Sequence, residues 1–297
     1  MKKWFLLLVL MLLSFAAIAL FGNIESENIR NEILPEQVQR IVSMAPNLTE
    51  ILFALGLDEK IVGVTVYSNH PSAAKIKPRI GTFWQPNIEA IIAANPDLVV
   101  TIGFPQQRTI ADRLKRIGCN CLTVDIENVP EFFEAVEKIA TVTGTESRAK
   151  ELISGIRSKL EKLAEMTRSE KKVKVLWVVQ REPLMVAGRK TFINEMIELA
   201  GGENAIGPTL QQYPSIGAEK VITCNADVII EPSMWQANLQ QQQVQAIQYW
   251  SKLKNVPAID NGRIYIIDGD AVSRLGPRLY EGTETIAKCL NPELFKK

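Results

Sequence analysis

Two carboxylates, Glu89 and Glu219, occupy the same position in two copies of a short sequence pattern. In residues 87–100 and 217–230, a glutamate opens an apolar helical turn, an asparagine follows six residues later, an aspartate stands two residues beyond it, and an apolar strand begins (Glu89, Asn95, Asp97; Glu219, Asn225, Asp227). This matched spacing predicts one helix–turn–strand unit used twice, once in each half of a two-lobed molecule. Two equivalent anionic groups favour a docking surface over catalysis.

The residue types that usually carry enzyme chemistry are sparse in this chain. His70 is the one histidine, and it precedes Pro71 in a stretch that we expect to be an exposed loop. No strand is followed by G-x-G-x-x-G or G-x-x-x-x-G-K-[ST], and no serine stands in G-x-S-x-G. The sequence therefore predicts no catalytic residue, no metal site and no cofactor.

The four cysteines would be oxidised in an exported protein wherever the geometry allows it. Cys119 and Cys121 stand two residues apart on one face of an expected strand, which places them poorly for a bond to each other. Cys224 could pair with Cys289 in the second half of the chain, but the sequence leaves this pairing open.

The N-terminal residues have the pattern of an export signal. Lys2 and Lys3 precede an apolar run over residues 4–20, and residues 17–19 (Ala-Ile-Ala) offer a cleavage site. An uncleaved membrane anchor is the alternative, because about 17 apolar residues is near the lower limit for crossing a bilayer. Since the first cysteine is Cys119, we expect no lipid-modified N-terminus.

The chain without this signal is nearly neutral. Removing Lys2 and Lys3 lowers the 34 basic residues to 32, against 33 acidic ones. A nucleic-acid partner favours a strongly basic surface, so none is expected. The remaining roughly 275 residues suit two lobes better than one typical domain.

Short apolar strands alternate with amphipathic helices from Arg40 onward, which predicts an α/β fold with largely parallel sheets and helices on both faces. The expected strands cover residues 41–44, 61–66, 98–102, 121–124, 173–179, 228–230 and 264–267. Residues 146–168 carry apolar side chains at three- and four-residue spacing and predict one helix of roughly 23 residues, about 35 Å long. We therefore expect a signal peptide over 1–20, a first α/β lobe over 38–143, a connecting helix over 144–170 and a second α/β lobe over 171–297.

Further local signals mark the ends of individual helices. The spacing from Glu50 to Gly56 equals that from Glu195 to Gly201, which predicts two equivalent helices that each end at a glycine. Asn47 is expected to cap the first of them. Pro277 is expected to begin the last helix. The glutamine run over residues 240–243 is interpreted as a solvated helix face.

Five segments carry a resemblance to a known family: residues 40–50 (RIVSMAPNLTE), 66–71 (VYSNHP), 82–89 (TFWQPNIE), 201–204 (GGEN) and 273–278 (SRLGPR). With the export signal, the two lobes and the long helix, the chain resembles the helical-backbone class of periplasmic substrate-binding proteins of ABC importers. This class serves cobalamin, haem, iron–siderophore complexes and some metals. The resemblance is greatest to the vitamin cobalamin-binding proteins and covers residues 40–290.

The resemblance implies a monomeric periplasmic carrier, not an enzyme, with a ligand cleft between its lobes. By motif position, the cleft would hold two aromatic residues of the first lobe and four residues of the second (Tyr67 and Trp84; Met185, Tyr213, Asp270 and Arg274). Met185 stands where the family pattern has an aromatic residue. The resemblance also implies that Glu89 and Glu219 dock onto arginines of a dimeric membrane permease.

Each of these residues could also have a purely structural role. Trp84 could cover the core of the first lobe, and Tyr67 could be a packing residue at a strand end. Asp270 and Arg274 are four residues apart and could pair with each other on a surface loop. A carboxylate in the first turn of a helix gains roughly 0.3–1 kcal/mol from the helix dipole, which would justify Glu89 or Glu219 alone.

Three hypotheses follow for function. The leading one is a carrier that captures cobalamin or a related corrinoid. Such a large ring gains binding energy from contact with aromatic side chains and from a few polar groups that anchor its rim. A haem or iron–siderophore carrier is the alternative within the family, with Tyr67 on haem iron, or Arg274 and Arg181 on an anionic siderophore. An exported α/β transferase is the hypothesis from another class, and it requires a titratable catalytic group in the cleft.

Overall fold

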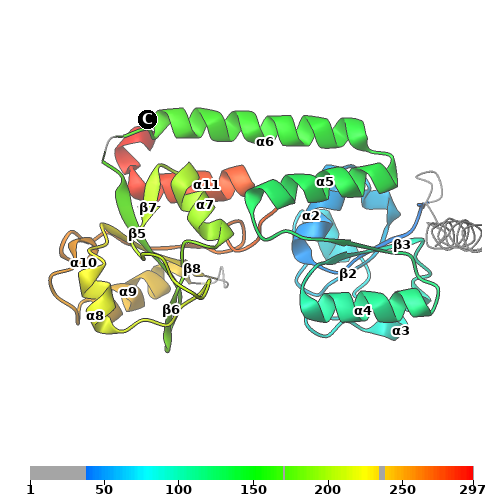
Figure 1. The fold of residues 1–297 in the computed structure, drawn as a ribbon, viewed down its shortest axis with the longest axis horizontal. Helices are drawn as coiled ribbons and strands as arrows, with labels where there is room; N and C mark the ends of the chain where they lie inside the picture. The colour runs from blue at the N-terminus through cyan, green and yellow to red at the C-terminus, as the bar shows by residue number, and fades with distance from the viewer. Residues whose placement is uncertain (1–37, 170, 234–237, 297) are drawn as a thin grey trace, which may run out of the picture.

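The computed structural model describes residues 38–169, 171–233 and 238–296, and Figure 1 shows its ribbon. The expected signal peptide and its cleavage site lie outside the described residues. Among the described helices, none combines the length and apolarity that crossing a bilayer requires.

The first lobe is built on a four-stranded parallel sheet in the order β2-β1-β3-β4. Its strands are β1 (Ile41–Ser43), β2 (Ile61–Val64), β3 (Leu98–Ile102) and β4 (Cys121–Val124). The helices between and after them are α2 (Pro46–Ala54), α3 (Ile88–Ala93), α4 (Pro105–Arg116) and α5 (Val129–Thr143). Short 3₁₀ turns cover Asp58–Lys60 and Ser72–Ile76.

The second lobe holds a five-stranded sheet in the order β6-β5-β8-β9, with β7 also pairing with β5. Its strands are β5 (Val173–Arg181), β6 (Leu184–Val186), β7 (Gly202–Asn204), β8 (Val228–Ser233) and β9 (Ile264–Asp268). All pairings are parallel except that of β6 with β5. The helices are α7 (Phe192–Leu199), α8 (Ala218–Thr223), α9 (Leu239–Trp250), α10 (Pro257–Asp260) and α11 (Leu279–Leu290), followed by a 3₁₀ turn at Pro292–Phe295.

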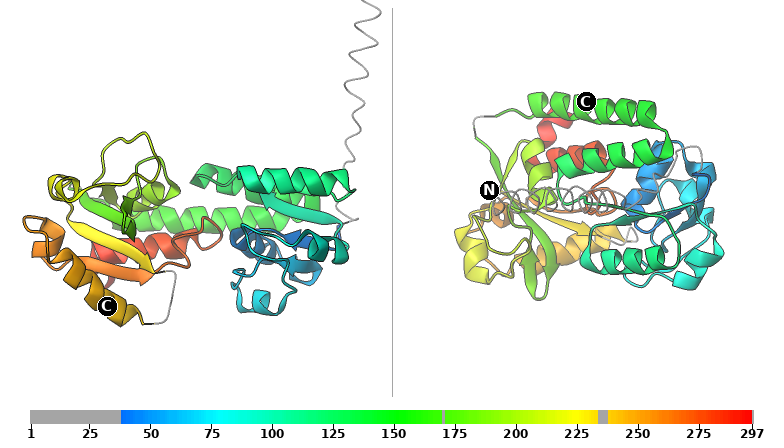
Figure 2. Two further views of the ribbon diagram at one scale, coloured as in Figure 1. Left: turned by 90° about the horizontal axis from the view of Figure 1, so that it is seen from below. Right: turned by 45° about the vertical axis from the view of Figure 1, so that its right-hand side comes forward.

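One helix, α6 (Glu146–Met166), connects the two lobes, as the sequence predicts, although it ends two residues early. It packs against α5 of the first lobe and against α7 and α11 of the second. Its buried side recurs at three- and four-residue spacing (Ala149, Ile153, Ile156, Leu160 and Leu163). Figures 1 and 2 show the lobes at opposite ends of this helix. One hydrophobic core runs from the first lobe beneath α6 into the second.

The duplicated unit predicted from the sequence is present in both lobes. Asn95 and Asn225 leave α3 and α8 with φ angles of 44° and 52°, in the left-handed region that asparagine tolerates. Asp97 Oδ2 then accepts a hydrogen bond from the backbone nitrogen of Arg40, and Asp227 Oδ2 accepts one from that of Lys174, each at 2.9 Å. Each aspartate thus fastens the start of its strand to the central strand of its sheet.

Three local expectations were wrong. Ala45, not Asn47, precedes the first turn of α2, because Pro46 takes the first helical position. The last helix begins at Leu279 rather than at Pro277. Gln243 does not simply face solvent: its side chain donates to Ile264 O at 2.7 Å and accepts from Ile266 N at 2.8 Å, which fastens α9 to β9.

Candidate ligand-binding and docking sites

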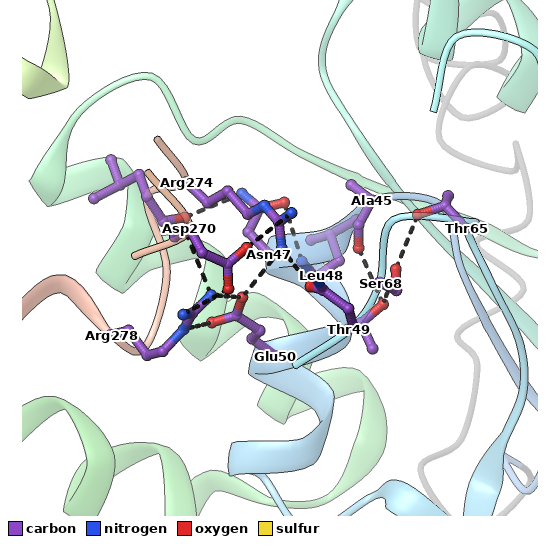
Figure 3. A network of polar contacts seen from close by, with 12 residues as sticks. Ala45, Asn47, Leu48, Thr49, Glu50, Thr65, Ser68, Asp270, Arg274 and Arg278 are labelled. Atoms are coloured by element: carbon purple, nitrogen blue, oxygen red, sulfur yellow. Dashed lines mark hydrogen bonds and ion pairs between the residues drawn. The ribbon is translucent and has the colours of Figure 1, made fainter. Parts of the chain in front are cut away.

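Asp270 and Arg274 lie in a polar network that joins the two lobes (Figure 3). Arg274 Nη2 lies 3.0 Å from Asp270 Oδ1, so the two residues do pair with each other. They are not on an open surface loop, because their side chains are only 15% and 17% exposed. Arg274 Nη1 also donates to Asn69 Oδ1 of the first lobe at 3.0 Å.

Glu50 and Arg278 form the most buried part of this interlobe network. Arg278 donates from Nε and Nη2 to the two carboxylate oxygens of Glu50 at 2.8 and 2.6 Å, and from Nη1 to Asp270 at 2.9 Å. The Glu50 side chain is 4% exposed. Burial lowers the pKa of Arg278, but its hydrogen bond and charge pairing with Glu50, joined by Asp270, outweigh burial and raise that pKa above its ordinary value. The negative charges of the two carboxylates (Glu50 and Asp270) therefore balance the positive charges of the two guanidinium groups (Arg274 and Arg278).

A chain of buried hydroxyl groups supports the first-lobe side of the network (Figure 3). The Ser43 and Thr49 hydroxyls lie 2.8 Å apart, and Thr49 donates to Ser68 Oγ at 2.9 Å. Ser68 is also 2.9 Å from the Thr65 hydroxyl and is fully buried. This chain fixes the backbone between Tyr67 and Asn69, so the Tyr67 side chain starts from a rigid base.

The two predicted aromatic ligand residues of the first lobe are exposed. Tyr67 is 59% exposed and Trp84 is 54% exposed, so neither is simply a core residue. Trp84 makes edge contacts with Phe83 and Phe104, at ring-centroid distances of 4.9 and 5.3 Å. Phe104 is itself 43% exposed, and it was not among the residues predicted for the cleft.

Two glutamines of α4 hold the loop that carries Trp84. Gln106 Nε2 donates to Trp84 O, and Gln107 Nε2 donates to Phe83 O at 2.6 Å. Gln107 is almost fully buried, so its amide is a fixed support. The position of Trp84 thus depends on α4 as well as on its own loop.

Met185 and Tyr213 lie together in the second lobe. Met185 on β6 bridges to Ser215, and Val186 N donates to Pro214 O at 3.1 Å, so the loop before α8 runs along β6. Tyr213 is half-buried and packs against the main core, and this burial raises the pKa of its phenol. The backbone contacts thus bring Met185 close to the loop that carries Tyr213, and Tyr213 itself serves packing.

Arg181, which the siderophore hypothesis requires as an anion-binding residue, already has a partner. It donates from Nε and Nη2 to Glu231 Oε2 at 2.9 and 2.7 Å. The Glu231 side chain is 10% exposed and also accepts from Trp250 Nε1 at 2.5 Å. No local sequence pattern could indicate this partner, because Glu231 lies 50 residues away on β8.

Glu89 and Glu219 are both exposed, in the first turns of α3 and α8. Neither carboxylate has a hydrogen bond or ion pair with the described residues. Figure 1 places α3 and α8 on the side of the molecule opposite α6, one on each lobe. The matched acidic residues Asp97 and Asp227 are engaged in the fold, whereas Glu89 and Glu219 are free to meet a partner.

The cysteines remain unpaired in this structure. Cys224 and Cys289 are each buried as free thiols, so the disulfide that the sequence left open is not formed. Burial raises the pKa of Cys289 to about 12 and that of Cys121 to about 11, where the neighbouring Cys119 adds to the rise. Within the described ranges, no group of three His, Cys, Asp or Glu side chains could hold a metal ion.

Comparison with known proteins gives a consistent set of relatives. A lipoprotein of Bacillus subtilis (YvrC), named as an uncharacterized ABC transporter substrate-binding protein, is 30% identical over 272 residues, covering 89% of this chain and 83% of its own. A vitamin B12-binding protein of Vibrio parahaemolyticus is 25% identical, covering 82% and 86%.

Solved structures agree with these relatives. A possible iron-binding (periplasmic solute-binding) protein of Staphylococcus epidermidis has a TM-score of 0.74 at 28% identity and covers 85% of this chain and 98% of its own. A periplasmic haem-binding protein of Pseudomonas aeruginosa has a TM-score of 0.75 at 25% identity, covering 86% and 93%.

The periplasmic binding protein family matches residues 41–271. The family and these relatives are solute-binding transport proteins, which excludes the exported transferase. The chain belongs to the periplasmic binding protein family and is a solute-binding protein of an ABC importer, with the helical-backbone fold.

Proposed function

We propose that this protein is an extracytoplasmic carrier that captures cobalamin, or a related corrinoid, between its two lobes and delivers it to an ABC import permease. The observation that carries the choice of ligand is the charge pairing of the arginines near the expected ligand residues. Arg274 and Arg278 are paired with Glu50 and Asp270, and Arg181 is paired with Glu231.

A neutral ligand suits this charge balance. A ferric siderophore or a haem with two propionates brings negative charge, and burying a charge without a partner is costly. Cyanocobalamin carries no net charge, and the rim of its corrin ring is lined with uncharged amides. Polar groups such as Asn69 and Asp270 can anchor those amides without an ion pair.

The exposed aromatic side chains support a large flat ligand. Tyr67 and Trp84 each leave more than half of their surface in solvent, with Phe104 beside Trp84. Aromatic side chains contribute large apolar contact areas to ligand sites. The vitamin B12-binding relative from Vibrio parahaemolyticus supports the same ligand class.

Haem is the second candidate, because one observation favours it. The Tyr67 side chain is 59% exposed, and its hydroxyl makes no hydrogen bond with the described residues, so the phenol could ligate ferric haem iron. The Pseudomonas aeruginosa haem-binding structure supports this alternative. An anionic siderophore is less well supported, since Arg181 and Arg274 are both paired.

Delivery would use Glu89 and Glu219 as docking groups for arginines of the permease. Charge-assisted bonds between carboxylates and arginines fix register, and a two-fold permease presents equivalent sites to the two lobes. We further propose that the protein acts as a monomer and is exported by its N-terminal segment, as a periplasmic protein or held at the membrane by an uncleaved signal.

Retention of a coloured ligand tests the proposal. The purified protein is mixed separately with cyanocobalamin, haemin and a ferric catecholate siderophore, each mixture is dialysed, and the absorption spectrum is recorded. We expect the cobalamin spectrum to remain with one ligand per chain. Retention of haemin alone, with loss of the signal in Tyr67→Phe, would establish the haem alternative.

A further inference from the structure

A small cavity lies where the strand order of the second sheet reverses. β5 is followed along the chain by β7 on one side, whereas β8 and then β9 lie on the other side. The cavity, of about 220 Å³, opens at the carboxyl ends of β5 and β8. In open parallel sheets, ligands bind in the crevice at such a reversal.

The cavity adjoins both groups of expected ligand residues in the second lobe. Arg181, on its wall, pairs in register with Leu184, the residue before Met185. Ser233, also on its wall, accepts a hydrogen bond at 2.8 Å from the nitrogen of Gly269, the residue before Asp270. Met185 and Asp270 therefore each directly follow a residue that is bonded to the cavity wall.

The size of the cavity sets what it can hold. Pockets for whole ligands measure roughly 300–1,000 Å³, so a volume of about 220 Å³ suits one arm of a larger molecule. Its wall includes polar side chains such as Gln180 and Gln245. The Gln245 side chain is exposed and has no hydrogen bond with the part of the chain that the structure describes, so its amide can both donate and accept.

Glu231 decides the charge of this cavity. Without it, Arg181 would present a cation to any ligand arm. With it, two N–H groups of Arg181 and the indole N–H of Trp250 are directed to one carboxylate. The guanidinium also lies 5.3 Å from the ring centre of Tyr249, which fixes its position. An anionic arm would meet Glu231 at short range, whereas an uncharged amide would meet no repulsion.

We propose that this cavity is a subsite for an uncharged, hydrogen-bonding arm of the ligand, a carboxamide, and that Glu231 determines this preference by neutralising Arg181. The subsite rests on the proposed function for the identity of the whole ligand. Its own claim, the exclusion of a carboxylate in favour of an amide, can be measured separately.

Cyanocobalamin and its three propionate monocarboxylate derivatives, each with one side-chain amide hydrolysed, are the probes. In the wild-type mature chain, at least one isomer should bind tenfold or more weakly than cyanocobalamin. In Glu231→Gln, Arg181 is freed, and the same isomer should bind at least as tightly as cyanocobalamin. The matched control is Glu203→Gln, which frees Arg189 from a half-exposed pair away from the cavity and should retain the wild-type preference. Equal affinities for all isomers in wild type would overturn the subsite.

A second pair of variants tests the subsite independently, in case Glu231→Gln does not fold. Gln245→Leu should lower the affinity for cyanocobalamin about fivefold or more. Gln248→Leu, on the same helix but outside the cavity wall, should leave the affinity unchanged. Equal binding by both variants would contradict the subsite.

If the proposed ligand is wrong, the binding measurements differ from those expected if only the subsite is wrong. If wild type binds haemin and not cyanocobalamin, the ligand assignment fails. The subsite then predicts that Glu231→Gln strengthens binding of haemin but not of its dimethyl ester. No change in that ratio would overturn the subsite as well.

Discussion

Glu195 Oε2 accepts a hydrogen bond from the backbone nitrogen of Val129 at 2.7 Å, and the two residues belong to different lobes. Val129 is the first residue of α5. The equivalent residue of the first lobe, Glu50, reaches in the opposite direction to Arg278 at the start of α11. Each lobe therefore contacts the start of a helix of the other lobe through a matched glutamate. Glu195 binds the backbone of the first residue of α5, where a carboxylate also favours the helix dipole, and Glu50 binds the side chain of Arg278, the residue just before α11. Together with α6, these two contacts restrict hinge motion.

The Glu50–Arg278 contact should contribute strongly to stability. Removing one member of a buried ion pair leaves the other charge uncompensated, which typically costs about 3–5 kcal/mol. We expect Glu50→Gln to lower the free energy of unfolding, measured by urea denaturation, by about 3 kcal/mol. The control Glu284→Gln breaks a pair with the half-exposed Lys288 and should cost less than about 1 kcal/mol. Equal effects of the two substitutions would contradict the structural role of Glu50.

Trp84 should contribute directly to ligand binding. Gln106 and Gln107 hold the backbone of the loop that presents its exposed ring, and a stacking contact between such a ring and a flat ligand is worth about 1–3 kcal/mol. Trp84→Ala should weaken the affinity for cyanocobalamin by that amount in calorimetry. Ile76→Ala, which changes a side chain that is 86% exposed, is the control and should bind as wild type does. Unchanged affinity in Trp84→Ala would remove this residue from the site.

The docking role of Glu89 and Glu219 predicts a loss of transport without a loss of binding. The double substitution to alanine should leave ligand affinity unchanged, since both side chains are exposed and unpaired within the described structure. Uptake of radiolabelled cobalamin by cells should fall strongly. The control is the double substitution of Glu161 and Glu165, two exposed glutamates on α6, on the opposite side of the molecule. Normal uptake by the Glu89/Glu219 variant would rule out docking through these residues.

Stability should fall at alkaline pH through Cys289. Burial raises the pKa of its thiol to about 12 from 9.0, so between these values the unfolded chain releases a proton that the folded chain keeps. This favours unfolding increasingly as pH rises from about 9 to 12. Cys289→Ala should therefore lose less stability than wild type between pH 8 and pH 11. The control is Cys119→Ala, which removes a less buried thiol and should follow the pH dependence of wild-type stability more closely. If stability plotted against pH ran parallel for Cys289→Ala and wild type, the predicted pKa shift of Cys289 would be contradicted.

Local patterns were enough to predict the architecture. The spacing of Asn95 and Asp97 after Glu89, repeated after Glu219, correctly indicated a duplicated unit, because each unit is stabilised by its own turn and strand. The apolar positions of residues 146–168 likewise predicted α6, which ends at Met166, since helical periodicity is read within a few turns. The short strands β6 and β7 were missed, and β7 (Gly202–Asn204) has no apolar side chain that a strand pattern could detect.

The interlobe and cavity contacts could not be predicted in this way. Glu50 and Arg278 are 228 residues apart, and Arg181 and Glu231 are 50 apart, so no local spacing joins them. Asn47 looked like a helix cap from its position, but its side chain instead donates to Leu275 O in the other lobe at 3.0 Å. Charge pairing in the folded chain, rather than residue type, determines which arginines remain available to a ligand.

Calorimetric titration with cyanocobalamin, at low and high salt, tests the central claim most directly. We expect one ligand per chain and an affinity that changes little between about 50 mM and 500 mM salt, because salt screens interactions between charges and the ligand has no net charge. Excess haemin should not displace it. The absence of binding heat with cyanocobalamin, together with tight binding of one haemin, would contradict the account.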